Sequence, residues 1–209
     1  MTQTEGRRPT NFSTDDGVDL QGIWVGGGDL SLVLVHEMGG DLDAWGPAPD
    51  WLAREGFRVL MFDLRGHGAS DGEAAPEAVD VDVTAAIAAA RGDSSVVIVV
   101  CAGDVAEGTI AAALQARPDG LVLVSPEFPF EARASSERIV LPSLAILDQA
   151  SEQWVDRVTR IQAGLIGWRM IVHAGTTEHG SALLSGKWAS HAHEHIRSFA
   201  RQTARPHRA

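Results

Sequence analysis

The sequence predicts an α/β fold, a doubly wound and mostly parallel sheet with helices on both faces. Short runs of β-branched and other apolar residues alternate along the chain with alanine-rich stretches of helical character. The runs are apolar at every position rather than at every second one, which is typical of parallel strands covered on both faces. Strands and helices in strict alternation then predict parallel strands joined by crossover helices.

The expected elements can be placed in order. After an N-terminal hairpin around glycines 26–28, we expect parallel strands at residues 32–36, 57–63, 96–102, 120–126, 142–147 and 168–174. The helices between and after them are expected at residues 44–54, 77–91, 104–116, 152–165 and 187–203. Sites in such sheets form at the carboxyl ends of the strands, so the residues that follow each strand are the functional candidates.

Composition limits the class of protein. A chain of 209 residues with 44% apolar and 22% charged residues predicts a single domain over residues 1–209 with a sizeable core. Its apolar runs fall far short of the about 20 residues of a membrane helix. The N-terminal residues carry no apolar signal segment, so we expect a cytoplasmic protein that does not bind membranes. A net charge of −11 disfavours nucleic acid as a partner.

No cofactor or metal is expected. The turn after the first parallel strand reads HEMGGDLDAW, which lacks the G-x-G-x-x-G dinucleotide fingerprint, and the chain has no phosphate-binding P-loop. The absence of tyrosine excludes phenol chemistry, and a single lysine makes Schiff-base chemistry improbable. His191, His193 and His195 resemble a chelating cluster, but only the first and last would share a helix face.

Three segments at strand ends resemble motifs of the α/β-hydrolase superfamily. HEMGG (36–40) is similar to the H-G-x-G-G oxyanion loop, and FRVLMFDLRGHGASDG (57–72) to the strand and loop that follow it. EHGSALL (178–184) resembles the catalytic-histidine loop of the dienelactone-hydrolase and small-esterase branch. The resemblance covers nearly the whole chain and implies a hydrolase core.

The usual elbow serine of this family, in the pattern G-x-S-x-G, is missing. Counting back from Arg117-Pro118, where the family usually ends the following helix, puts Asp104 at the elbow between small neighbours. The resemblance then implies an aspartate nucleophile, as in haloalkane dehalogenases and epoxide hydrolases. Epoxide opening of the family type is not expected, because tyrosine is absent and residues 127–141 are too few for a cap domain.

Two other interpretations of this segment stay open. Asp104 and Glu107 also form D-x-x-E at a helix start, a capping box that needs no catalysis. Alternatively, Cys101 could be the nucleophile, as a cysteine is in dienelactone hydrolases, although it lies inside an apolar run that is typical of a core strand.

The remaining catalytic candidates follow from the same resemblance. His179 lies in the loop after the last strand and suits proton transfer near neutral pH. The acid that orients it would be Asp148 or Glu127. By position, the backbone N–H groups of Met38 and Val105 would bind the oxyanion.

Glu37 replaces the usual glycine of the H-G motif. The sequence places its carboxylate beside the oxyanion donors, where a negative charge would oppose a developing oxyanion. This argues against acyl transfer of the ordinary serine-esterase kind.

The sequence therefore predicts a capless small-molecule hydrolase with Asp104 at the elbow, His179 as general base and an atypical triad. The alternative is a catalytically silent protein of the same fold that binds a ligand or a protein partner. Trp154 and Trp188, near predicted helices, leave a homodimer open.

Overall fold

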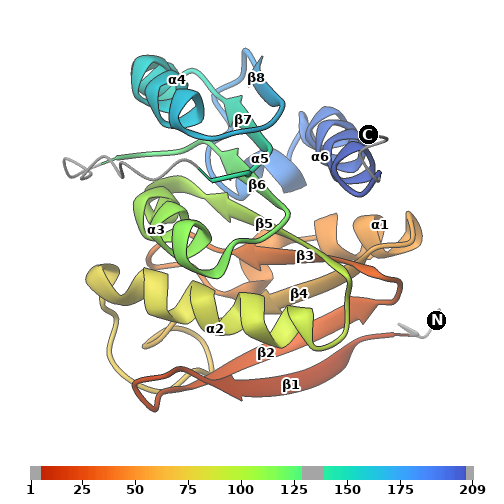
Figure 1. Cartoon of the computed structure of the whole chain (residues 1–209), viewed down its shortest axis with the longest axis vertical. Coiled ribbons are helices and arrows are strands. Elements are labelled where there is room, and N and C mark those ends of the chain that lie inside the picture. The colour runs from red at the N-terminus through yellow and green to blue at the C-terminus, as the bar shows by residue number, and fades with distance from the viewer. Residues whose placement is uncertain (1–5, 129–138, 206–209) are drawn as a thin grey trace.

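The computed structural model describes residues 6–128 and 139–205, and it contains a mixed eight-stranded sheet (Figure 1). The strand order is β1-β2-β4-β3-β5-β6-β7-β8, with β1 and β2 antiparallel to their neighbours and the other strands parallel. The strands are β1 Arg8–Ser13, β2 Asp19–Gly26, β3 Leu30–Val35, β4 Arg58–Phe62, β5 Val96–Ala102, β6 Gly120–Val124, β7 Ser143–Leu147 and β8 Arg169–His173.

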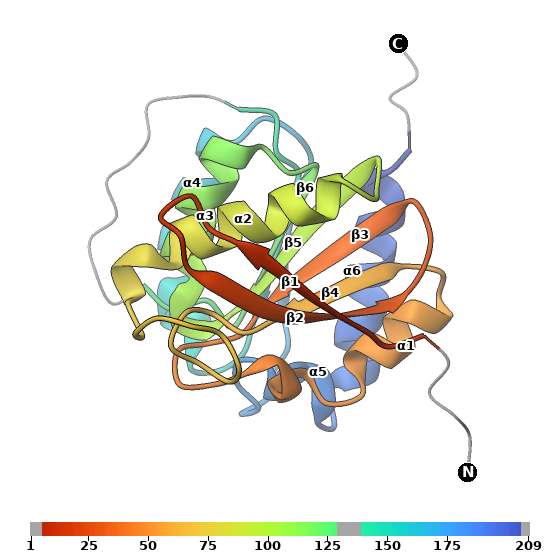
Figure 2. The same ribbon diagram turned by 90° about the horizontal axis from the view of Figure 1, so that it is seen from below.

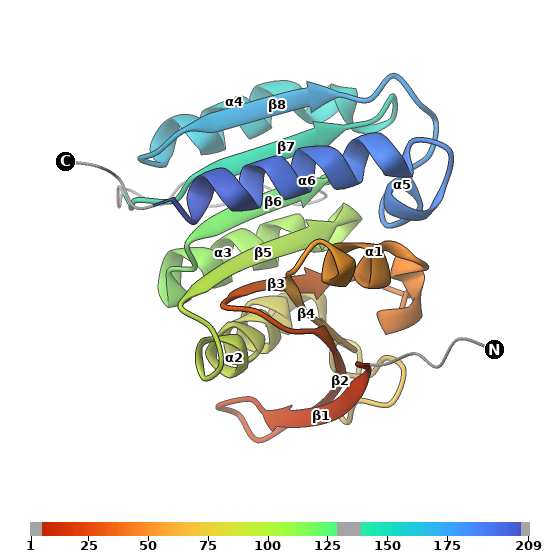
Figure 3. The same cartoon turned by 90° about the vertical axis from the view of Figure 1, so that its right-hand side faces the viewer.

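Helices cover both faces of this sheet, which confirms the predicted fold class. One face carries α1 (Ala48–Arg54), α5 (Ala182–Ser185) and α6 (Ala189–Thr203), and the other α2 (Val79–Arg91), α3 (Ala106–Ala116) and α4 (Val155–Gly164) (Figures 2 and 3). Four short 3₁₀ turns complete the described part, at Leu42–Trp45, Pro76–Ala78, Gly103–Val105 and Ser151–Trp154. None of the described helices is long and apolar enough to cross a bilayer.

The strand side chains contribute to two separate hydrophobic cores, one on each face of the sheet, because successive residues of a strand point to opposite faces. In β5, Val99 and Cys101 pack on the side of α2, α3 and α4, whereas Val100 and Ala102 pack on the side of α1 and α6. All four side chains are fully buried. This two-sided burial is why the central strands are apolar at every position.

The N-terminal hairpin exists, but its turn was predicted in the wrong place. β1 and β2 are joined by a turn in which the Thr14 N–H donates to the Val18 carbonyl and the Gly17 N–H to the Thr14 carbonyl. Gly26 and Gly28, with φ of +72° and +122°, instead lead from β2 to β3. Those two strands are not neighbours, because β4 lies between them.

All five predicted helices begin later than expected, and a 3₁₀ turn precedes four of them. The stretch expected as helix 44–54 divides into a 3₁₀ turn and α1, separated by Gly46 in a left-handed conformation with φ of +52°. The stretch expected as helix 104–116 starts as the 3₁₀ turn Gly103–Val105, and α3 follows from Ala106.

Buried charges hold the loop after β4. Both carboxylate oxygens of Asp82, on α2, accept hydrogen bonds from Arg65, one from its backbone N–H at 2.9 Å and one from Nε at 2.8 Å. The Arg65 guanidinium also contacts Asp16 in the β1–β2 turn. The segment that resembles a family motif thus ties α2 and the hairpin to the sheet.

Candidate active site

The candidate residues meet at one edge of the sheet because they follow parallel strands at their carboxyl ends. Met38 follows β3, Asp104 follows β5, Glu127 follows β6, Asp148 follows β7 and His179 follows β8. The hydrogen bonds among these loops define the site.

His179 and Asp148 form a close pair. The Nδ1–H of His179 donates to Oδ2 of Asp148 at 2.6 Å, a short distance typical of a charge-assisted bond. The other oxygen, Oδ1, accepts the Ser151 N–H at 2.7 Å. Ser151 in turn accepts the Asp148 N–H through its hydroxyl at 2.9 Å. Both oxygens of Asp148 are therefore engaged, and its carboxylate orients the imidazole ring.

The pKa of Asp148 lies below its usual value. Burial acts to raise this pKa, because a buried carboxylate loses its hydration. The Ser151 N–H, the neighbouring Ser125 hydroxyl and His179 favour the charged form and outweigh that effect. Ser125 is fully buried at the end of β6 and has a φ of +46°, a conformation rare for a residue other than glycine. Nothing in the sequence around Ser125 marks this support.

Glu127 contacts the opposite side of the imidazole. Its Oε1 lies 3.3 Å from Nε2 of His179, and its side chain is 42% exposed, whereas that of Asp148 is 1% exposed. The Glu127 N–H donates to the Gly103 carbonyl at 3.0 Å, which holds this residue against the turn after β5. Of the two acids that the sequence left open, Asp148 therefore lies at Nδ1, the nitrogen through which a triad acid orients the ring. Glu127 lies at Nε2, the nitrogen that would accept and return the proton.

The turn after β5 lies one residue earlier than the count from Arg117 predicts. Gly103, not Asp104, has the left-handed backbone, with a φ of +65°. Glycine adopts this conformation without the steric penalty of a Cβ atom, so the turn forms at Gly103 and not at Asp104. Asp104 directly follows this elbow residue, within the 3₁₀ turn.

The Asp104 side chain points across to the loop after β3. Its Oδ1 accepts the Met38 N–H at 3.0 Å, so one carboxylate oxygen occupies a predicted oxyanion donor. Among the described residues this is the one hydrogen bond of the Asp104 side chain, and none goes to a backbone N–H at the start of α3. The capping-box interpretation is therefore contradicted, while the role of the Val105 N–H stays a prediction.

Glu37 joins the loop after β3 to the loop that carries His179. Its Oε1 accepts the Ser181 hydroxyl at 2.8 Å and the Ser181 N–H at 3.3 Å. The sequence placed this carboxylate beside the oxyanion donors but gave no sign of its partner, which lies 144 positions further along the chain.

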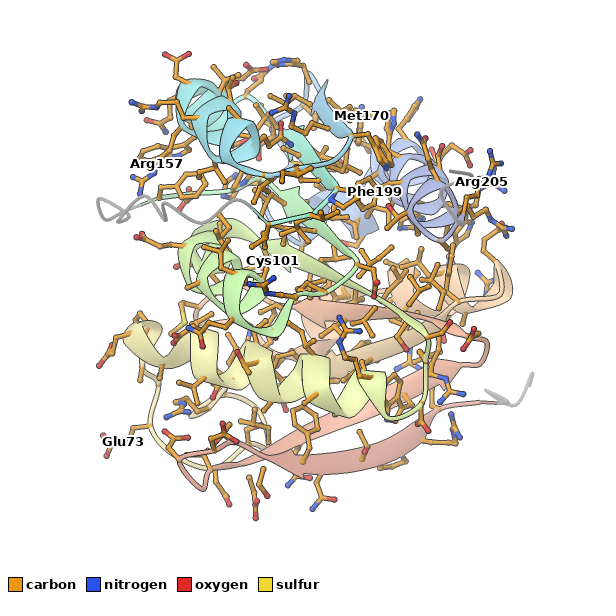
Figure 4. All side chains as sticks on the ribbon, in the orientation of Figure 1. Glu73, Cys101, Arg157, Met170, Phe199 and Arg205 are labelled. Atoms are coloured by element: carbon orange, nitrogen blue, oxygen red, sulfur yellow. The ribbon has the colours of Figure 1, made fainter. Side chains whose placement is uncertain are left out.

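Cys101 does not belong to the site. It is fully buried inside β5 and lies at the centre of the molecule (Figure 4). Burial raises the pKa of its thiol to about 12, so the reactive thiolate does not form near neutral pH. This contradicts the alternative in which Cys101 is the nucleophile.

Other histidines of the described residues form hydrogen bonds to backbone groups or stack on aromatic side chains. The Nε2 atoms of His36 and His67 accept the backbone N–H groups of Leu64 and Gly39, each at 3.0 Å. His191 stacks on Trp188 at the surface. Over residues 6–128 and 139–205, no three histidine, cysteine or carboxylate side chains come together in a metal-binding arrangement.

Solved structures of esterases share this fold at low sequence identity. The esterase Pf2001 of Pyrococcus furiosus aligns with a TM-score of 0.74 and 17% identity over 94% of this chain and 92% of its own. A structure described as a bacterial heroin esterase aligns with a TM-score of 0.75 and 18% identity over 98% of this chain and 87% of its own. An esterase of Thermogutta terrifontis gives a TM-score of 0.69 and 15% identity over 95% and 100%.

The sequence is also similar to a curated relative and to a protein family. The uncharacterized protein YfhR of Escherichia coli (strain K12) is 33% identical over 92 residues, which is 41% of this chain and 32% of YfhR. The match thus spans about a third of the length of that relative. Residues 29–208 match the family described as serine aminopeptidase, S33. Because this match covers most of the chain, the protein belongs to the S33 serine aminopeptidase family of the α/β-hydrolase superfamily, a family of hydrolases.

Proposed function

We propose that the protein is a small-molecule hydrolase in which Asp104 is the nucleophile and His179 the general base. The observation that carries the proposal is the hydrogen bond from the Met38 N–H to Oδ1 of Asp104 at 3.0 Å. It holds one oxygen at an oxyanion donor, and no hydrogen bond to Oδ2 is recorded within the described residues. An aspartate nucleophile needs this arrangement, because one oxygen attacks while the other later carries the negative charge.

In the first step, Oδ2 of Asp104 attacks a saturated carbon of the substrate. A carbon–oxygen bond forms as the bond to the leaving group breaks, and the leaving group departs with its electron pair. The product of this step is an ester of Asp104. Substrates with a displaceable group on carbon, such as haloalkanes, suit this chemistry best.

In the second step, Nε2 of His179 takes a proton from a water molecule, whose oxygen attacks Cγ of the Asp104 ester. The negative charge that develops on Oδ1 is stabilised by the Met38 N–H. The ester bond breaks, the product alkoxide takes the proton back from Nε2, and the new carboxyl group of Asp104 releases its own proton. Asp148 stabilises the charged imidazole through the bond at Nδ1.

The proposal includes a bare core without a cap domain and a small-molecule substrate. Only 18 residues separate the ends of β6 and β7, at Val124 and Ser143, and residues 129–138 among them lie outside the described part. A segment of this length is too short to fold as a separate domain.

A panel of haloalkanes, lactones and esters tests the assignment. We expect turnover of at least one class by the natural protein, and its loss in Asp104→Asn and in His179→Ala. Asp119→Asn is a matched control, since this aspartate lies beside the start of β6, at the opposite end of the strands. Turnover that survives both site substitutions would contradict the proposal.

One observation favours a second candidate, a catalytically silent ligand-binding protein. The left-handed elbow residue is Gly103, which offers no side chain where the superfamily usually has its nucleophile. A ligand that binds the natural protein and His179→Ala alike, without turnover in the whole panel, would support this candidate over the hydrolase.

A further inference from the structure

The loop that carries His179 is held on both sides of the histidine by glutamate carboxylates. On one side, Glu178 accepts the backbone N–H groups of Lys187 and Trp188, at 2.6 and 2.9 Å. On the other side, Ser181 donates its hydroxyl and its N–H to Oε1 of Glu37. The first contact is local, whereas the second joins the histidine loop to the loop after β3.

Two glycines of the site pack closely against Glu37. A Cβ atom on Gly180 would lie 2.8 Å from Oε1 of Glu37, and one on Gly103 would lie 3.1 Å from its Cβ. Both glycines have left-handed backbones, with φ of +61° and +65°. Glu37 therefore lies between the elbow and the residue that follows His179, and it fills space at both.

We propose that Glu37 is a positioning residue, which fastens the His179 loop to the elbow through Ser181. Its effect on turnover rests on the proposed function, but the fastening itself does not. The carboxylate oxygen Oε1 is engaged by Ser181, whereas Oε2 is buried without a hydrogen-bond partner among the described residues, so the contacts of this carboxylate are with the histidine loop. The hydrogen bond to Asp148 orients the imidazole ring of His179. The contact between Glu37 and Ser181 fixes the backbone of the loop that carries this ring.

The first test measures the loop without any substrate. Amide hydrogen exchange of residues 178–182 and the proton resonance of the His179 Nδ1–H are recorded for the natural protein, Glu37→Ala and Glu37→Gln. We expect faster exchange and a broadened or lost resonance in Glu37→Ala. Glutamine keeps the acceptor oxygen at this position, so Glu37→Gln should behave like the natural protein.

The second test uses turnover, where a substrate from the panel is known. In Glu37→Ala, kcat should fall roughly 10²-fold, the effect of misplacing a catalytic group by about 1 Å, with a smaller change in KM. Glu37→Gln should recover most of this loss. Glu55→Ala is a matched control, because this glutamate is also half-buried but pairs with Arg197 on α6, beside the start of β4 and so at the opposite end of the strands.

Some results would overturn the proposal. Unchanged exchange and an unchanged His179 resonance in Glu37→Ala would do so, even in a protein without turnover. A Glu37→Gln variant as impaired as Glu37→Ala would show that the charge matters and not the contact. Should Glu37→Ala fail to fold, Ser181→Ala replaces it, since it removes the 2.8 Å bond alone and should give the same changes to a smaller extent.

Discussion

Asp148 meets His179 through one carboxylate oxygen and is held in place through the other. Replacement by asparagine puts an amide group where the His179 Nδ1–H needs an acceptor, which favours the wrong tautomer of the imidazole. We expect Asp148→Asn to lower kcat on the order of 10⁴-fold, as in triads whose acid is changed in this way. Steady-state kinetics on a substrate of the panel measures it.

Glu127→Gln is the comparison for that variant, because Glu127 also contacts the imidazole. Its side chain is 42% exposed, and exposed ion pairs contribute about 1 kcal/mol or less, so kcat should change less than about tenfold. The reverse ranking of the two variants would contradict the assignment of Asp148 as the orienting acid.

At the scale of the elements, sequence reasoning placed every parallel strand and the long helices, because apolar runs and alanine-rich stretches directly reflect burial. It failed where a turn replaces the start of a helix. The count back from Arg117 assumed a continuous helix, but a 3₁₀ turn precedes α3 and the left-handed residue is Gly103. The glycine itself was the signal for that position. The contact between Glu37 and Ser181 could not be predicted, since it depends on tertiary packing.

The link between α2 and the loop after β4 gives a prediction on stability. Asp82 is fully buried and pairs with Arg65, which is 8% exposed. Asp82→Asn leaves the Arg65 guanidinium with only the exposed carboxylate of Asp16 as a charged partner, so it should lower the free energy of unfolding by about 3 kcal/mol. Urea denaturation measures the loss. Asp80→Asn, a half-buried neighbour on the same helix, should change it by less than about 0.5 kcal/mol, and equal losses would contradict the role of the pair.

For the molecule as a whole, two buried histidines predict how stability depends on pH. Burial lowers the pKa of His36 and of His193 in the folded state below the ordinary value of 6.5. Below pH 6.5 the unfolded chain therefore binds more protons, and the free energy of unfolding should fall as the pH decreases. Each histidine contributes at most about 1.4 kcal/mol per pH unit.

The His193→Gln variant isolates one of these contributions. His193 stacks on Trp51 and its Nε2–H donates to the Leu184 carbonyl at 2.8 Å, a bond that the glutamine amide can replace without titrating. Denaturation between pH 5 and 7 should show a shallower pH dependence for His193→Gln than for the natural protein. The exposed His191 on the same helix is the control, and a slope reduced equally in His191→Gln would contradict the account.

The covalent role of Asp104 is the central claim, and a single turnover in water enriched in oxygen-18 tests it most directly. If the Asp104 ester forms and water attacks its Cγ, mass spectrometry of the protein will find the heavy oxygen in the peptide that contains Asp104, and the first product will lack it. Label found only in the product, with none in that peptide, would show that water attacks the substrate directly and would contradict the mechanism.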